Sequence, residues 1–175
     1  MSSEPTPQLF LSVFNQGITQ VKEQEKELFH NQLYFSNVIS LMEQYLSNLF
    51  IFEIENDSTS LQRLANHDKF RSATVTIPFA LNNSIESYLI KSMKSLVWHR
   101  LNDVEMYYKK VINIRFNISG ELLTQLELRH DLVHRNGHKL DGTRVDITED
   151  NLNRCITLIE LFINDIHKKY IEAKS

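Results

Sequence analysis

Hydrophobic residues recur every three or four positions through an early segment of this chain. Their spacing places them along one side of a helix. They are Val38, Leu41, Met42, Tyr45, Leu49 and Phe52. The preceding KEQEKE, residues 22–27, is polar throughout and is typical of a solvated helical face. The pattern predicts one long helix over about residues 19–55, or two helices with a break near Asn31.

The same periodicity returns near the C-terminal end. Thr148 is a favourable N-cap residue, and the apolar positions after it alternate gaps of four and three. They are Leu152, Ile156, Ile159, Ile163, Ile166 and Tyr170. The run is too short to hold a free coiled coil together. It therefore predicts a final helix that buries this stripe in the core.

The segment between these helices is less regular. Residues 56–70 allow a short helix, whereas SATVTIPFAL, residues 72–81, is rich in β-branched residues and contains a proline. This composition predicts an extended connector. The chain has only four glycines and three prolines, so its interior favours helices. Together the patterns predict a single all-α domain over residues 1–175, with residues 1–17 as a less ordered N-terminal segment.

Three cap signals predict where further helices begin. Asn83 with Glu86 and Asn102 with Glu105 have the three-residue spacing of a capping box. Ser119 is a suitable N-cap for the helix that follows it. Beyond that helix, Gly137 and Gly142 permit a chain reversal.

Composition narrows the function classes. The chain has 175 residues, 42% of them hydrophobic, and a formal net charge of -3. It therefore has no overall basic field of the kind that recruits nucleic acid along its whole surface, and any polyanion must be held locally. Cys155 is the one cysteine, which excludes an intramolecular disulfide and a CxxC metal motif.

The sequence also bears on where the protein acts. Its first ten residues, MSSEPTPQLF, lack the basic and apolar regions of a secretory leader. The most apolar stretch, LFIFEIEND, contains Glu53 and is far shorter than the ~20 residues that span a bilayer. The expected protein is cytoplasmic and has no membrane partner.

One segment, ELRHDLVHRNGHKLDG (residues 127–142), gathers two arginines and three histidines into ten residues. On a helical wheel from Ile118 to His134, an apolar arc surrounds Arg129. A guanidinium keeps its charge, and burying it unpaired costs several kcal/mol. Arg129 therefore needs an anionic partner or several hydrogen-bond acceptors.

Two explanations for Arg129 remain open. The structural one is an ion pair with Glu43 or Glu86 from another helix, with the histidines near the helix C-terminus, where cations are favoured. The functional one rests on His130 and His134, which are four residues apart and share one edge of the arc. With Arg129 these histidines would form a site.

The same helix carries an expected ion pair beside the histidines. Asp131 and Arg135, also four apart, fall on the outer side of the helix as an expected ion pair.

Metal binding is the first chemistry that the histidines suggest. His130 and His134 have the spacing of helical zinc ligands, and His138 follows four residues later. However, no glutamate lies between the first two to act as a base, and Gly137 is expected to end the helix before His138. The two His-Asp dipeptides, at residues 67–68 and 130–131, resemble those of metal phosphohydrolases but are too short to be specific. We therefore predict no metal and no cofactor.

Cleavage of RNA without a metal is the better chemical match. Histidine can hold or release a proton near neutral pH, and an adjacent arginine can stabilise charge on a reacting phosphate. RNA supplies its own nucleophile, the 2'-hydroxyl, so the protein needs no serine, cysteine or metal.

The segment RHDLVHRNG, residues 129–137, resembles the signature of the HEPN superfamily, an arginine followed four to six residues later by a histidine. Arg129 matches the arginine, His130 the polar position after it, and His134 the histidine. VISLMEQYLSNLF, residues 38–50, is similar to an early core helix of such domains. Histidine stands where asparagine or aspartate is most familiar after the arginine.

The resemblance implies an up-and-down bundle of four or more helices that dimerises through the motif helix, so that both copies of Arg129 and His134 face one cleft. Many members are metal-independent endoribonucleases of toxin–antitoxin or antiviral systems that leave a 2',3'-cyclic phosphate. Others are non-catalytic modules that bind a partner or nucleotide, or partners of an antitoxin or nucleotidyltransferase.

Carried onto this chain, the resemblance implies a role for each motif residue. His134 transfers a proton, Arg129 stabilises the phosphate, and His130 orients Arg129 or assists the proton transfer. The expected RNA contacts at the rim are Arg135, Asn136, Lys139 and Arg144.

Overall fold

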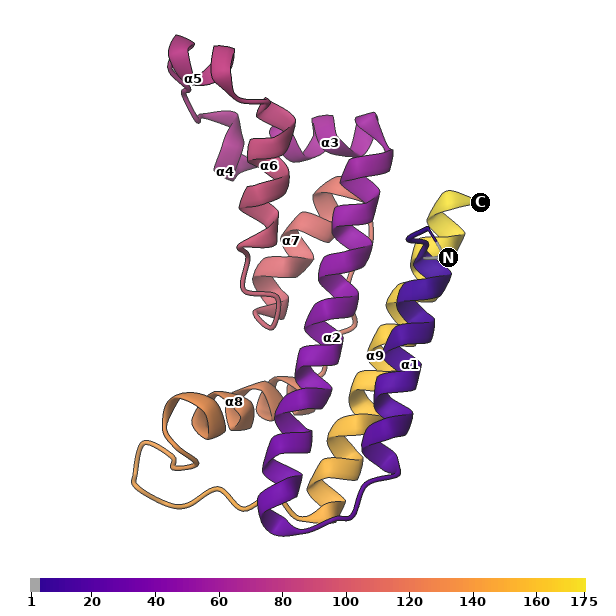
Figure 1. Ribbon diagram of the computed structural model, residues 1–175, viewed down its shortest axis with the longest axis vertical. Coiled ribbons are helices and arrows are strands. Elements are labelled where there is room, and N and C mark those ends of the chain that lie inside the picture. The colour runs from indigo at the N-terminus through magenta and orange to yellow at the C-terminus, as the bar shows by residue number, and fades with distance from the viewer. Residues whose placement is uncertain (1–3) are drawn as a thin grey trace.

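The computed structural model describes residues 4–175, and these residues form nine helices and no strand (Figure 1). The all-α prediction is confirmed. In chain order the helices are α1 (Pro7–Lys22), α2 (Leu28–Asn56), α3 (Ser58–Ala65), α4 (Asp68–Arg71), α5 (Ile77–Asn82), α6 (Ile85–Lys94), α7 (Leu101–Val111), α8 (Gly120–His134) and α9 (Glu149–Lys174).

The three longest helices, α1, α2 and α9, run side by side, and α2 contacts both of the others (Figure 1). The predicted stripe of α9 is confirmed, since all six of its residues are buried. The apolar positions of α2 meet this stripe, and several of them, including Val38, Met42, Leu46 and Leu49, are completely buried. Burial of this apolar surface is the main force that holds the three helices together.

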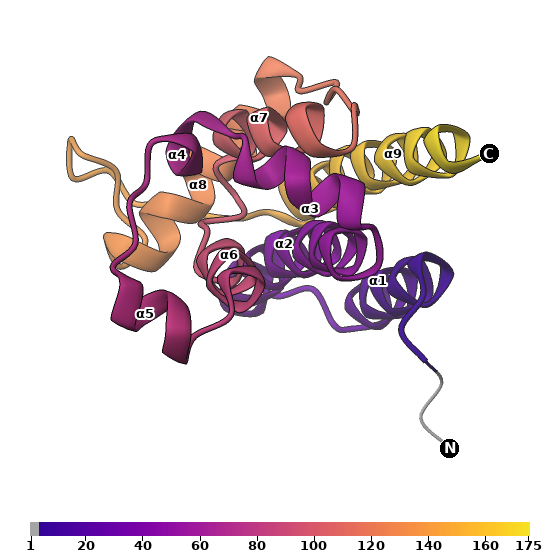
Figure 2. The same ribbon diagram turned by 90° about the horizontal axis from the view of Figure 1, so that it is seen from above.

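A second group of helices covers the C-terminal half of α2. Helices α3 and α6 contact α2, and α7 packs on α3. Tyr108 of α7 is completely buried and donates its hydroxyl to the carbonyl of Leu46 at 2.6 Å, which ties this layer to the bundle. Short α5 projects from the edge of the molecule and carries the exposed side chains of Ile77 and Leu81 (Figure 2).

Helix α8 leaves the bundle sideways, and a long loop returns from its end to the start of α9 (Figure 1). It contacts α2 and α9. Glu121 in its first turn forms an ion pair with Arg154 of α9, with Arg154 Nη2 at 2.6 Å from Glu121 Oε2. This bond lowers the pKa of Glu121. The motif helix is thus anchored at its N-terminal end and leaves the bundle at the other.

The N-terminal part of the chain differs from expectation. Residues 1–3 lie outside the described residues, but from Pro7 onward the predicted less ordered segment is helix α1, with Phe14 and Ile18 buried against the bundle. The break between the first two helices falls at residues 23–27, within KEQEKE, rather than near Asn31. This polar run has no apolar residue to pack on the core, so nothing stabilises helix there.

Two other local predictions were wrong. Residues 77–82 are helical rather than extended, because Pro78 occupies the first turn of α5, where its missing N–H is not needed. The cap of α6 is Ser84, whose Oγ accepts from the Ser87 N–H, rather than Asn83.

Of the remaining caps, one failed and two are confirmed. Helix α7 begins after Arg100 and so precedes the expected cap at Asn102. The Ser119 cap of α8 and the Thr148 cap of α9 are confirmed.

No helix among residues 4–175 is both long enough and apolar enough to cross a bilayer.

Candidate functional site

Local signals fix where the motif helix begins and ends. Ser119 Oγ accepts from the N–H of Leu122 at 3.1 Å, and α8 then runs without interruption to His134. Asn136 and Gly137 follow with φ of 51° and 77°, in the left-handed region that suits asparagine and glycine. Two consecutive residues in this region cannot continue a right-handed helix, so the chain turns directly after the motif.

The loop after the motif is folded on itself and fastened to α2. The N–H of Lys139 donates to the carbonyl of Thr143 at 2.8 Å, and the N–H of Val145 donates to the carbonyl of Gly137 at 2.8 Å. Gln32 Nε2 of α2 then donates to the carbonyl of Val145 at 2.9 Å. The predicted chain reversal is confirmed, and it includes Lys139.

Arg129 lies on the side of α8 that faces the bundle and is partly buried. Its Nε is inaccessible to solvent and has no hydrogen-bond partner within residues 4–175. One turn earlier, Gln125 is 8% exposed, and its Oε1 also lacks a partner among the described residues. Two neighbouring polar side chains on the same face of α8 thus have a buried atom without a protein partner.

The ion pair considered for Arg129 is not observed. Glu43 instead contacts His99, and no ion pair between Arg129 and Glu86 occurs in the described part of the chain. A guanidinium that is partly desolvated and lacks a protein anion is suited to an anionic ligand.

The local pairs expected along α8 are present. The rings of His130 and His134 lie side by side, with centroids 4.8 Å apart and planes at 43°. Arg135 forms an ion pair with Asp131 one turn before it. Both results follow from the i, i+4 spacing, which places side chains next to each other on a helix.

A surface hollow of about 470 Å³ lies along the outer side of the motif helix. We call it the motif hollow. It is lined by Glu127, His130, Asp131, Arg135, Lys139, Leu140 and Asp141. Three residues of the predicted site, His130, Arg135 and Lys139, therefore meet in it.

The charges of the motif hollow are mixed, because its cations face three carboxylates. Asp141 accepts from the N–H of Thr143 at 2.9 Å, which lowers its pKa and keeps it ionised. Asp131 is engaged with Arg135. An anionic ligand in this hollow would therefore depend on Lys139 and on a hydrogen bond from His130.

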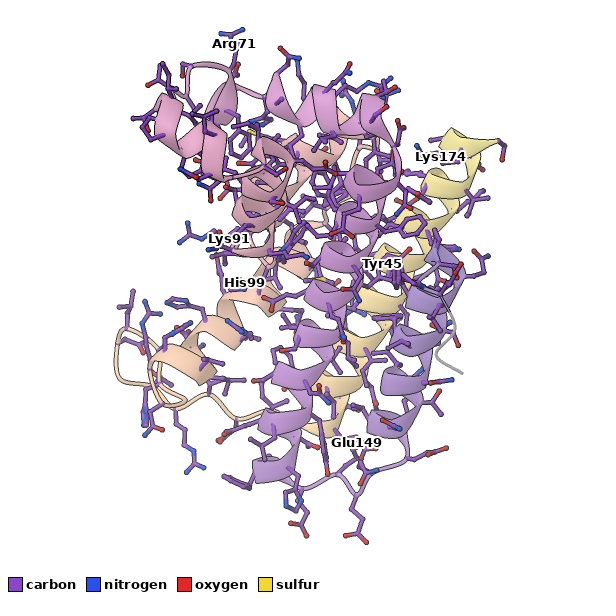
Figure 3. All side chains as sticks on the ribbon, turned by 45° about the horizontal axis from the view of Figure 1, so that its top comes forward. Tyr45, Arg71, Lys91, His99, Glu149 and Lys174 are labelled. Atoms are coloured by element: carbon purple, nitrogen blue, oxygen red, sulfur yellow. The ribbon has the colours of Figure 1, made fainter. Side chains whose placement is uncertain are left out.

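A second hollow of about 430 Å³ adjoins the first, since both are lined by Glu127 and His130. We call it the His99 hollow, after the histidine in the loop between α6 and α7 (Figure 3). Its full lining is His99, Arg100, Leu101, Asn102, Asp103, Leu123, Leu126, Glu127 and His130. His99 was not among the predicted site residues.

Arg129 and His134, the two residues that define the motif, do not share a hollow. Neither of them lines the motif hollow or the His99 hollow within residues 4–175. Residues five apart on an α-helix point about 140° away from each other, because each residue adds about 100°. One copy of α8 therefore presents the arginine and the histidine on different sides.

The other predicted rim residues lie on the loop. Arg144 is well exposed, and its Nε is 3.2 Å from Asp146 Oδ1. Its backbone forms an isolated bridge with His138, whose ring Nδ1 lies 3.0 Å from the carbonyl of Asn136. Asn136 is exposed. These three residues border the end of the motif helix, and neither Asn136 nor Arg144 lines the two hollows within the described chain.

The alternatives based on metals have no geometric support. Within residues 4–175, no three His, Cys, Asp or Glu side chains are grouped so that they could hold a metal ion. His67, the N-cap of α4, stacks on Tyr107 of α7 with a centroid distance of 4.3 Å. Figure 1 shows α4 near the opposite end of the molecule from α8. Cys155 is buried, which raises the pKa of its thiol to about 12 and makes it a poor nucleophile.

The chain matches no protein-family model, no curated protein and no solved structure.

Proposed function

We propose that the chain is a metal-independent endoribonuclease of the HEPN type that acts as a homodimer. The observation that carries this proposal is the state of Arg129: partly buried, with a solvent-inaccessible Nε and no anionic partner among the described residues. An arginine in that state gains most from a ligand that supplies the missing negative charge, and a phosphodiester does so.

The histidines supply the second requirement, a group that moves protons near neutral pH. His134 and His130 are exposed at the end of α8 with their rings in contact. In the proposed reaction the 2'-oxygen of RNA bonds to phosphorus, the P–O5' bond breaks, and the products carry a 2',3'-cyclic phosphate and a 5'-hydroxyl. His134 transfers a proton and Arg129 stabilises the charge on the phosphate.

Homodimerisation is part of the proposal because one motif helix directs Arg129 and His134 to different sides. Two copies of α8 that face each other can bring the arginine of one to the histidine of the other. Exposed apolar side chains next to the motif favour such a contact. Val133, between the two histidines, is 48% exposed, and Leu140, in the following loop, is 86% exposed.

The test is incubation of the purified protein with total RNA and a tRNA pool in excess EDTA, followed by end-group analysis. We expect cyclic phosphate ends from wild type and at least a 100-fold loss of rate in Arg129→Ala and in His134→Ala. Arg71→Ala and His67→Gln, which lie on and beside α4, are the matched controls and should cleave normally. Unchanged cleavage in both motif variants would refute the assignment.

The alternative is a non-catalytic module that binds a nucleotide or a partner. The mixed charges of the motif hollow favour it, since Arg135 and Lys139 face Glu127, Asp131 and Asp141. It predicts that folded, dimeric wild type yields no RNA product with or without added metal, while a nucleotide still binds and the affinity falls in Lys139→Ala.

A further inference from the structure

His99 is held by a carboxylate at the edge of the proposed site. Its Nδ1 is within hydrogen-bonding distance of Glu43 Oε1, and both side chains are 22% exposed. The two residues are 56 positions apart and belong to the α6–α7 loop and to α2. An ionised carboxylate can only accept, so Nδ1 carries the proton and Nε2 is left as the nitrogen available to a ligand.

The surroundings of His99 connect it to the motif helix. The His99 hollow has its loop and the first turn of α7 on one side, and α8 with His130 on the other. Its other charged groups are Arg100, Asp103 and Glu127. A ligand in this hollow therefore meets one imidazole in a fixed orientation, a second imidazole from the motif, and an arginine.

The chemistry proposed above needs two proton transfers. The 2'-hydroxyl must lose a proton as its oxygen attacks, and the 5'-oxygen must gain one as it leaves. The motif assigns one of these steps to His134, and for the other it offers only His130, which either orients Arg129 or assists the proton transfer.

Other histidines of the chain fit the remaining step less well. His167 is 8% exposed and lies 2.8 Å from the Tyr45 hydroxyl, inside the bundle. The ring Nδ1 of His138 lies 3.0 Å from the carbonyl of Asn136 in the same loop, and the ring of His67 stacks on Tyr107 of α7. His130 has a ring neighbour but, among the described residues, no hydrogen-bonding partner that would fix its tautomer.

We infer that His99, oriented by Glu43, is a second proton-transfer residue of the proposed ribonuclease, and that the His99 hollow receives the ribose whose 2'-hydroxyl attacks. This inference rests on the proposed function. His99 Nε2 accepts the 2'-hydroxyl proton while the 2'-oxygen bonds to phosphorus. The P–O5' bond breaks, and the leaving 5'-oxygen takes its proton from His134, whose ring lies beside the hollow, 4.8 Å from the ring of the lining residue His130. The Glu43 carboxylate stabilises the imidazolium that forms and is a positioning residue.

The first experiment measures steady-state cleavage by His99→Ala, by the more conservative His99→Gln, and by the control His67→Gln, after circular dichroism melts have shown that each is folded. We expect kcat to fall about 100-fold in both His99 variants and to stay unchanged in the control. Of these three variants, only His99→Ala should regain part of its cleavage rate when imidazole is added, because imidazole can replace the missing proton acceptor. A folded His99→Ala that cleaves at the wild-type rate overturns the inference and leaves the proposed function intact.

Glu43→Gln tests the positioning role. The glutamine amide can donate to Nδ1, which favours the tautomer with its proton on Nε2 and removes the acceptor that the reaction needs. We expect kcat to fall while KM stays near the wild-type value. A rise in KM with unchanged kcat would mean that Glu43 serves binding rather than orientation, against the inference.

The second experiment separates the two proton transfers. An RNA oligonucleotide with sulfur in place of the bridging 5'-oxygen at the mapped cleavage position has a thiolate leaving group, which needs no proton. His134→Ala should cleave this substrate nearly as fast as wild type, whereas His99→Ala should remain slow. If this substrate restores the cleavage rate of both variants, or of His99→Ala alone, the assignment of His99 as base is overturned. Wild type that cleaves neither substrate overturns the proposed function and the inference together.

Discussion

Two buried polar clusters of this protein have opposite hydrogen-bonding states. At one end of α2, Glu53 is 2% exposed and accepts from Tyr170 at 2.9 Å, from Lys174 at 2.5 Å and from Ser60 at 2.5 Å. On α8, Gln125 and Arg129 each have a buried polar atom without a partner among residues 4–175.

The difference fits a structural role for the Glu53 cluster and the proposed ligand-binding role for Gln125 and Arg129. A buried charge stabilises a fold only when its neighbours satisfy it, and the donors around Glu53 join α2, α3 and the end of α9 in this way (Figure 3 labels Lys174). The buried atoms of Gln125 and Arg129 form no such link within residues 4–175. Because desolvation without a partner is costly, the proposed function gives Arg129 a partner in the phosphate of its substrate.

The largest effect on stability is expected for Glu53→Ala. The substitution leaves the buried hydroxyl of Tyr170 without its acceptor. It also removes one of the two carboxylates that Ser60 and Lys174 contact, the other being Asp57. We expect the free energy of unfolding to fall by about 3 kcal/mol, the upper end of the roughly 1–3 kcal/mol that one stranded buried group costs. Urea unfolding followed by circular dichroism measures it, and a loss below about 1 kcal/mol would show that Glu53 is not a structural link.

A smaller effect is expected for Asp57→Asn, at the edge of the same cluster. The N–H of Thr59 and the Lys174 ammonium lower the pKa of Asp57 from 3.8 to about 2. A depressed carboxyl pKa adds stability that is complete above pH 4 and disappears as the pH falls from about 4 to about 2. Because the side chain is 35% exposed, we discount the contribution to about 1 kcal/mol or less.

The measurement is the free energy of unfolding of wild type and Asp57→Asn between pH 2 and pH 7. The variant should be less stable at neutral pH, and the two curves should converge near pH 2. Parallel curves over the whole range would mean that Asp57 does not contribute through its charge.

The fold could be predicted where the signal is local. The stripe of α9 and the caps at Ser119 and Thr148 depend on residues three or four positions apart, and helix geometry alone connects them. The start of α6 was misplaced by one residue because Asn83 and Ser84 are adjacent cap candidates, and the Asn83 side chain donates instead to the carbonyl of Phe79 in α5. The start of α1 was missed because its apolar residues are stabilised in a helix only by the helices that they pack on.

The candidate site divides in the same way. The contact of His130 with His134 and the ion pair of Asp131 with Arg135 follow from their spacing on one helix. The pairing of His99 with Glu43 joins two elements that are far apart in the sequence, so no local sequence pattern could predict it. The sequence indicated that Arg129 needs an anion, but only the tertiary structure could exclude a protein carboxylate as that anion.

The smallest effect on stability, and the sharpest test of the comparison, is expected for Arg129→Leu. If Arg129 awaits a ligand, removing it from the free protein breaks no ion pair and replaces a buried Nε by apolar atoms. We therefore expect the free energy of unfolding to stay within about 1 kcal/mol of wild type, or to rise. Gln125→Leu, one turn away, is the matched variant and should behave alike, since it also removes an atom without a partner.

The same Arg129→Leu variant should lose RNA cleavage but keep its stability. Glu53→Ala, in contrast, should lose both stability and activity. Urea unfolding and the EDTA cleavage assay on one preparation give both values. A loss of several kcal/mol in Arg129→Leu would mean that the guanidinium has a structural partner in the folded protein. The contrast between the two clusters would then no longer favour the proposed ligand.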